Sequence, residues 1–121
     1  MSSERRVLIV EDEPHIAEAL LFLCERDGIA ADAVDNGTAA LDRLADYDLL
    51  IVDIMLPGMS GFEVAQAARA APRPPKICVL TAKGQAGDRA RMTQIGVNAF
   101  VTKPFSNRDL METIRHLIAA P

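Results

Sequence analysis

The feature that most constrains this sequence is a set of five short apolar runs, evenly spread along the chain. The runs cover residues 7–10, 30–34, 49–52, 77–80 and 99–101. Most are rich in Val and Ile. They lack the alternation of polar and apolar residues that is typical of a strand with one solvent-exposed face. Continuous runs of this kind are typical of strands buried on both faces of a parallel sheet. None is long enough to cross a membrane.

Segments with helical spacing of apolar residues follow each run. We expect helices over residues 14–27, 37–45, 61–71 and 85–95, and from just after Ser106 to about residue 119. Gly28 suits the left-handed position that ends the first helix. Regular alternation with right-handed crossovers predicts a doubly wound α/β fold with helices on both faces of the sheet. We expect one domain over residues 1–121, with its core at about 5–119.

Composition excludes several classes of protein. Half of the residues are apolar, which rules out intrinsic disorder. The formal net charge is −4 and there is no basic run, so we expect neither direct nucleic-acid binding nor membrane attachment. The first apolar run is too short for a signal peptide, which predicts a cytoplasmic protein. Cys24 and Cys78 lie in apolar stretches without metal-ligand spacing, which favours buried free thiols.

Polar side chains gather where the predicted strands end. Glu11 and Asp12 follow the first run, Asp53 the third, Thr81 the fourth and Lys103 the fifth. Each alone has an ordinary explanation, such as acids favoured at the start of a helix. In a parallel sheet, however, these ends share one edge, where three acids would repel one another. A hard cation with oxygen ligands, best Mg²⁺, would resolve that repulsion.

Four motifs in order carry a resemblance to a known family. They are VEDE at 10–13, LIVDIMLPGMSG at 50–61, LTA at 80–82 and FVTKPF at 100–105. Together they resemble the receiver domain of two-component response regulators, of which the CheY-like chemotaxis regulators are the bare-domain form. The resemblance implies a flavodoxin-like (βα)5 fold with strand order 2-1-3-4-5. It also implies a signalling switch whose only chemistry is its own phosphorylation and dephosphorylation.

The resemblance assigns a role to each residue at the metal. It implies that Asp53 is the phosphoacceptor, receiving a phosphoryl group from a phosphohistidine of a histidine kinase or phosphotransfer protein. Asp12 is expected to bind Mg²⁺ directly and Glu11 largely through water. Asp53 and the backbone carbonyl of Met55 complete the expected protein ligands.

The resemblance also implies a switch. Lys103 and Thr81 are expected to contact the phosphoryl oxygens, and a cis peptide bond is expected before Pro104. Movement of Thr81 would leave space for Phe100, changing the surface of the fourth helix, fifth strand and fifth helix. An ordinary core aromatic is the alternative for Phe100.

Four further positions are implicated less directly. Met55 and Lys83 stand two residues after Asp53 and Thr81, where the family tunes the lifetime of the phosphate. Leu21 and Phe22 lie beyond the core stripe of the first helix. Either that helix has a wide buried face, or these residues contact the phosphodonor.

The output of such a switch is open. The chain is either a free-standing receiver that controls a protein partner, as a monomer or a phosphorylation-dependent dimer, or the N-terminal half of a DNA-binding regulator. Asn98 and Thr113 depart from the charged residues through which winged-helix regulators dimerise, and the chain stops at Pro121, soon after the last helix. An Asp-nucleophile phosphohydrolase is a distant alternative, because Met55 stands where such enzymes carry a second Asp.

Overall fold

The computed structural model describes residues 5–82 and 86–119. Its strands are β1 (Arg6–Val10), β2 (Ala30–Val34), β3 (Leu49–Asp53), β4 (Lys76–Ala82) and β5 (Ala99–Lys103). Its α-helices are α1 (Pro14–Arg26), α2 (Gly37–Leu41), α3 (Gly61–Arg69), α4 (Ala86–Ile95) and α5 (Asn107–Ala119), and a short 3-10 helix, η1, covers Leu44–Asp46.

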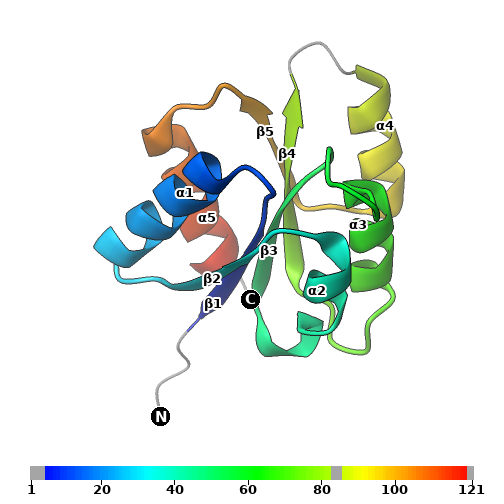
Figure 1. Ribbon diagram of the computed structural model, residues 1–121, viewed down its shortest axis with the longest axis horizontal. Coiled ribbons are helices and arrows are strands. Elements are labelled where there is room, and N and C mark those ends of the chain that lie inside the picture. The colour runs from blue at the N-terminus through cyan, green and yellow to red at the C-terminus, as the bar shows by residue number, and fades with distance from the viewer. Residues whose placement is uncertain (1–4, 83–85, 120–121) are drawn as a thin grey trace.

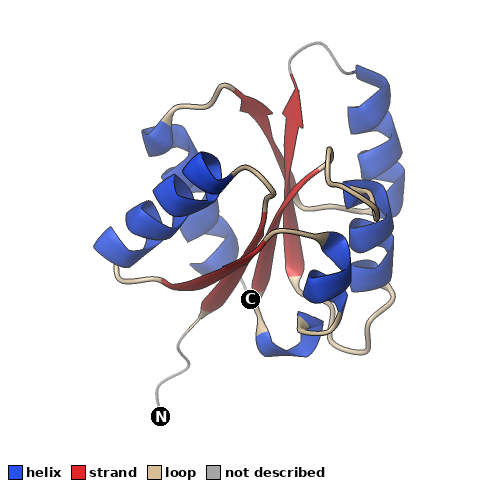
Figure 2. Cartoon of the chain, viewed as in Figure 1, coloured by secondary structure: helices blue, strands red, loops and turns tan. Residues whose placement is uncertain are grey.

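All strand pairs are parallel, and the five strands form one sheet in the order β2-β1-β3-β4-β5. Helices α1 and α5 cover one face of this sheet, and α2, α3 and α4 cover the other (Figure 1). The strands run in one direction between these two layers (Figure 2). The predicted doubly wound architecture and strand order are therefore confirmed.

Alternate residues of the central strands enter two separate cores. Leu8, Leu50 and Val79 face α2, α3 and α4, whereas Ile9 and Ile51 face α1 and α5. All five side chains are fully buried. Because β1, β3 and β4 are covered on both faces, nearly every position must be apolar, which explains the continuous apolar runs of the sequence.

Strands β4 and β5 extend two residues beyond the carboxyl ends of their apolar runs. Parallel pairing continues through Thr81 with Thr102 and Ala82 with Lys103. Backbone hydrogen bonding does not require apolar side chains, so the runs mark the buried centre of each strand rather than its end. Thr81 and Lys103 are consequently held in regular strand geometry rather than in loops.

The second helix is shorter than the sequence predicts. It is expected to reach residue 45 but ends at Leu41, and the chain continues into η1. Tyr47 directly follows η1 and is buried in the core, where its hydroxyl donates to Asp32 of β2 at 2.7 Å. The break in the helix turns the chain so that Tyr47 can reach this position, a tertiary contact that no local pattern reports.

Other local predictions agree with the structure. Gly28 has φ +74°, the left-handed value expected after α1. Cys24 and Cys78 are buried free thiols, and burial raises the pKa of Cys24 to about 11 and that of Cys78 to about 12. Within the described ranges, no helix combines the length and apolar character needed to cross a bilayer.

Candidate functional site

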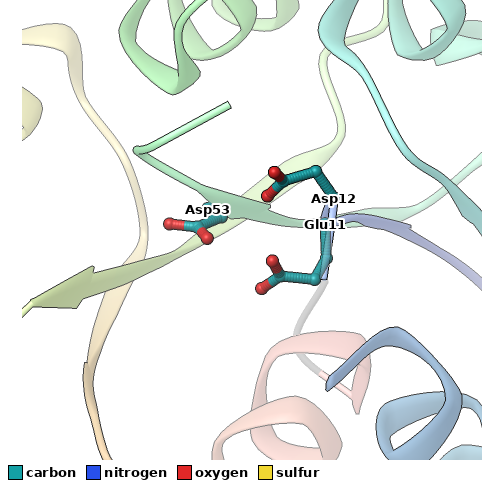
Figure 3. A group of neighbouring side chains, drawn as sticks. All are labelled: Glu11, Asp12 and Asp53. Carbon is teal, nitrogen blue, oxygen red and sulfur yellow. The ribbon is translucent and has the colours of Figure 1, made fainter. Parts of the chain in front are cut away.

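Three carboxylates meet at the carboxyl edge of the sheet. Glu11 and Asp12 follow β1, and Asp53 is the last residue of β3, the strand beside it. Ligand oxygens of the three lie within 4.8 Å of one another (Figure 3). Glu11 and Asp53 are buried, whereas Asp12 is exposed to solvent. The convergence predicted from the strand order is present.

Lys103 bridges two of these carboxylates from the far edge of the sheet. Its Nζ donates to Asp53 Oδ2 at 2.8 Å and to Glu11 Oε1 at 3.1 Å. Partial burial lowers the pKa of Lys103, but the hydrogen bonds and charges of Asp53 and Glu11 outweigh this and raise it overall. Lys103 therefore stays charged. The bond between Lys103 and Pro104 is cis, as predicted.

Backbone groups hold the two buried carboxylates in place. The Glu13 N–H donates to Glu11 Oε2, and the Met55 N–H donates to Asp53 Oδ1, each at 3.1 Å. Burial raises the pKa of Glu11, even though its hydrogen bonds to Glu13 and Lys103 oppose the shift. Each buried carboxylate thus uses both oxygens, one on the backbone and one on Lys103.

Thr81 supplies a polar group with no partner in the described part of the chain. Its Oγ1 is buried and makes no hydrogen bond. Thr81 lies one residue beyond Leu80, which pairs with Asp53 in the sheet register. A buried hydroxyl without a partner costs about 1–3 kcal/mol, so this group is available to a bound water or ligand.

The donor set suits a divalent metal. The cluster of three carboxylates and one ammonium carries a surplus of negative charge, and each carboxylate offers a metal an oxygen ligand. Mg²⁺ prefers one or two carboxylates together with water and phosphate oxygens. Glu11, Asp12 and Asp53 are the residues that could hold it, with Asp12 the most open to solvent.

Sequence reasoning missed the part played by Gly61. A Cβ at this position would lie 2.4 Å from the Asp53 carbonyl oxygen and 2.7 Å from Ile54 Cα. Only glycine therefore lets α3 begin directly against the end of β3, beside Asp53. A signal was present, because Ser60 and Glu63 form a capping box around a glycine at the first helical position, where glycine is otherwise unfavourable.

The remaining predicted residues lie around the site or apart from it. The Met55 side chain is 73% exposed beside Asp53, and Phe100 is half-buried against the core under α4. On α1, Leu21 packs partly against the core, whereas Phe22 is 65% exposed. The wide buried face therefore accounts for Leu21 and not for Phe22. Lys83 lies outside the described residues.

Comparison with known proteins gives consistent results. A family model described as the response regulator receiver domain matches residues 7–115. The sensory transduction protein RegX3 of Mycobacterium tuberculosis H37Rv is 43% identical over 115 residues, which cover 93% of this chain and 50% of RegX3. The transcriptional regulatory protein ResD of Bacillus subtilis is 34% identical over 97% of this chain and 49% of its own length. The chain thus spans about half the length of these curated relatives.

Solved structures show the same architecture. The receiver domain of the sensor histidine kinase PA1611 of Pseudomonas aeruginosa, with a magnesium ion coordinated in its active site cleft, matches with TM-score 0.87 and 26% identity. That match covers 98% of this chain and 100% of the other. The chemotaxis protein CheY4 of Vibrio cholerae matches with TM-score 0.88 over 95% of this chain and 99% of its own, and its 24% identity supports the fold alone.

The close approach at Gly61 is testable with a matched pair of substitutions. Gly61→Ala is expected to lower the free energy of unfolding by about 1–3 kcal/mol, because its methyl group meets fixed backbone. Gly87→Ala, within α4 with no atom within 4 Å of the added Cβ, is expected to be neutral or to stabilise by up to about 1 kcal/mol. Urea titration measures both, and equal effects would contradict this account of Gly61.

Proposed function

This chain belongs to the family of response regulator receiver domains, and on that premise we propose that it is a phosphorylation-dependent switch with Asp53 as its phosphoacceptor. The observation that carries the proposal is the placing of Asp53 beside two further carboxylates and within 2.8 Å of the Lys103 ammonium. A carboxylate held between a cation and a candidate metal site is suited to meet an anionic phosphoryl group.

The proposed step is a phosphoryl transfer without redox change. A carboxylate oxygen of Asp53 forms a bond to phosphorus while the bond from phosphorus to the donor's imidazole nitrogen breaks. The electron pair of that bond stays on the nitrogen, and the product is an acyl phosphate. Chemistry of this kind needs positioning and charge stabilisation more than acid–base catalysis. The domain itself is the molecule that is phosphorylated, and hydrolysis of the acyl phosphate returns it to the unphosphorylated state.

We propose Mg²⁺ as the cofactor of this step. Asp12 and Asp53 would be its direct carboxylate ligands, with Glu11 acting largely through water and the Met55 carbonyl completing the protein ligands. When bound, Mg²⁺ supplies charge that screens the repulsion between Asp53 and the incoming phosphoryl oxygens. The surplus of negative charge among the three carboxylates supports this assignment.

Lys103 and Thr81 would bind the transferred group. The Lys103 ammonium, already 2.8 Å from Asp53, would donate a hydrogen bond to a phosphoryl oxygen. The Thr81 hydroxyl, which lacks a partner in the described residues, would donate to another. Drawing Thr81 toward the phosphoryl group would leave space for Phe100, a half-buried residue of β5 with Arg89 of α4 over its ring. That movement would alter the α4, β5 and α5 surface.

Two neighbouring side chains would set how long the phosphate lasts. The proposal for Met55 is supported by its exposure directly beside Asp53, on the path that an attacking water would take. Lys83 is proposed for the same task from its position in the sequence alone. Small residues at both positions should alter the rate of dephosphorylation.

We propose a sensor histidine kinase or histidine phosphotransfer protein as the phosphodonor, in the cytoplasmic compartment predicted from the sequence. The exposed Phe22 on α1 supports a docking surface on that helix, to which Leu21 contributes only its accessible part. An aromatic side chain that is open to solvent is a common anchor of protein interfaces.

A second candidate is the receiver half of a DNA-binding regulator. It is favoured by the relatives, of which this chain covers about half, and by the description of ResD as a transcriptional regulator. Asn98, one departure from the winged-helix pattern, has a local role, because its Oδ1 accepts the Ile77 N–H at 2.8 Å. In either case the target would be a downstream protein or an attached effector domain.

The assignment of Asp53 is tested by phosphorylation with acetyl phosphate and Mg²⁺. Intact mass spectrometry should show one added phosphoryl group on the wild type and on the control Asp42→Asn, whose side chain is exposed away from the site. The adduct should be absent from Asp53→Asn and should decline when EDTA removes the metal. An unmodified wild type, or an adduct that persists on Asp53→Asn, would refute the proposal.

The proposed contact of Thr81 with the phosphoryl group can be tested separately from its effect on the stability of the fold. Thr81→Val keeps the shape but removes a buried hydroxyl without a partner, so the free energy of unfolding should stay level or rise by about 1 kcal/mol. Binding of beryllofluoride with Mg²⁺, a phosphoryl mimic, should weaken by about tenfold through loss of a charge-assisted hydrogen bond. Unchanged affinity for the mimic would contradict the contact.

Docking on α1 is tested with two phosphodonors. Phe22→Glu should slow phosphotransfer from the cognate autophosphorylated kinase by about tenfold or more, because it places a charge on the apolar contact. Labelling by acetyl phosphate, which needs no docking surface, should be unaffected. Equal rates from the kinase for Phe22→Glu and the wild type would exclude Phe22 from the interface.

A further inference from the structure

Charge is strongly segregated along this chain. Residues 64–98 contain six Lys and Arg but a single acid, Asp88. The other residues contain seven Lys and Arg against sixteen Asp and Glu. The net charge of −4 therefore conceals a basic segment, which covers most of α3, all of β4 and all of α4, within an acidic protein.

The two regions also differ in how their cations are used. Each of the seven cations outside this segment forms an ion pair: Arg5 with Asp48, Arg6 and Arg43 with Asp32, Arg26 and Arg115 with Asp27, Arg108 with Glu112, and Lys103 with Glu11 and Asp53. Within the segment, Arg69, Arg73, Arg89 and Arg91 pair with no carboxylate of residues 5–82 or 86–119.

Two of these guanidinium groups, Arg69 and Arg91, line one groove. It lies between α3 and α4, has a volume of about 490 Å³, and is lined by Gln66, Arg69, Ala70, Arg91, Gln94 and Ile95. Helices α3 and α4 stand side by side on the same face of the sheet (Figure 1). None of the described residues that line the groove is a carboxylate, and its two glutamine amides can both donate and accept hydrogen bonds.

Arg91 is restrained before any partner arrives, and Arg69 lies close to the backbone of Gly96. The Arg91 guanidinium lies 3.9 Å from the centre of the Phe62 ring, which is buried against the core. The Arg69 guanidinium lies beside Gly96, where its Nε is 3.3 Å from the position that a Cβ would occupy. A side chain held over a ring, as Arg91 is, loses less conformational freedom on binding, which favours recognition of an anion.

We propose that the α3–α4 groove binds an acidic polypeptide segment, with carboxylates on Arg69 and Arg91 and an apolar side chain against Ala70 and Ile95. Arginine pairs with carboxylates in a bidentate manner, and the glutamines suit the backbone of an extended peptide. This surface is distinct from the carboxyl edge that holds Asp53, and the proposal does not depend on phosphorylation.

The distribution of charge favours an acidic peptide as the partner over a nucleic acid or a second copy of this chain. A nucleic acid would extend beyond the groove and meet a surface with sixteen acids against seven cations. A second copy of the chain would have to bind through a different, acidic surface, which gives an open, head-to-tail contact rather than a closed dimer. A short acidic segment meets neither obstacle.

The test uses the full chain and a fluorescein-labelled peptide of sequence EELEE, with QQLQQ as its neutral counterpart. Fluorescence anisotropy at about 50 mM and about 500 mM NaCl measures affinity and its dependence on salt. Arg69→Gln/Arg91→Gln removes the groove cations. Arg26→Gln/Arg108→Gln is the matched control, since it makes the same change in net charge at exposed cations outside the groove. Circular dichroism verifies that both variants fold.

The proposal predicts that EELEE binds at low salt and QQLQQ about tenfold or more weakly. The groove variant should lose about tenfold in affinity for EELEE, and the control less than about twofold. If the loss of Arg91 from Phe62 unfolds the double variant, Arg69→Gln alone should lose about threefold.

Four results would overturn the proposal. They are absence of EELEE binding at millimolar peptide, equal losses in the groove and control variants, tighter binding of a single-stranded oligothymidylate than of EELEE, and self-association of the wild type that the groove substitutions abolish. The third result would assign the groove to nucleic acid, and the fourth to a second copy of the chain.

Discussion

Burial of the central strands on both faces is the constraint on which the rest of this structure depends. Strands β1 and β3 carry fully buried side chains such as Ile9, Val10, Leu50 and Ile51, and these side chains alternate between the two cores. Two layers of helices are required to cover them. The strand ends are therefore fixed in place, and this restricts the movement of the residues that directly follow them.

The carboxyl edge of the sheet uses this rigidity to hold an arrangement that is unfavourable by itself. Three carboxylates lie together with a single lysine, burial raises the pKa of Glu11, and the Thr81 hydroxyl has no partner among the described residues. Each of these costs stability, and flexible loops would relax them. Strands buried on both faces cannot relax, so the three carboxylates stay close together despite this cost. Gly61 serves the same end by allowing α3 to begin directly against Asp53.

The distribution of charge separates two kinds of surface. On most of the molecule, each arginine lies beside an acid, and these pairs at the surface contribute little to stability. Along α3 and α4 the arginines lie over aromatic rings or beside a groove instead, so that their charge stays available to a partner. The site at the carboxyl edge and the α3–α4 groove therefore lie on different parts of one rigid frame, one acidic and one basic.

The sequence by itself determined the strand–helix alternation, the two cores and the residue types at the carboxyl edge. It could do so because burial on both faces leaves continuous apolar runs, and because parallel strands bring their ends to one edge. Tertiary structure alone decided the early end of α2, which turns the chain to bury Tyr47, and the bridging of Glu11 and Asp53 by Lys103. It also decided the split between a partly buried Leu21 and an exposed Phe22, and the groove between Arg69 and Arg91. Each of these depends on distances between segments remote in the chain, and local patterns of residues carry no information about such distances.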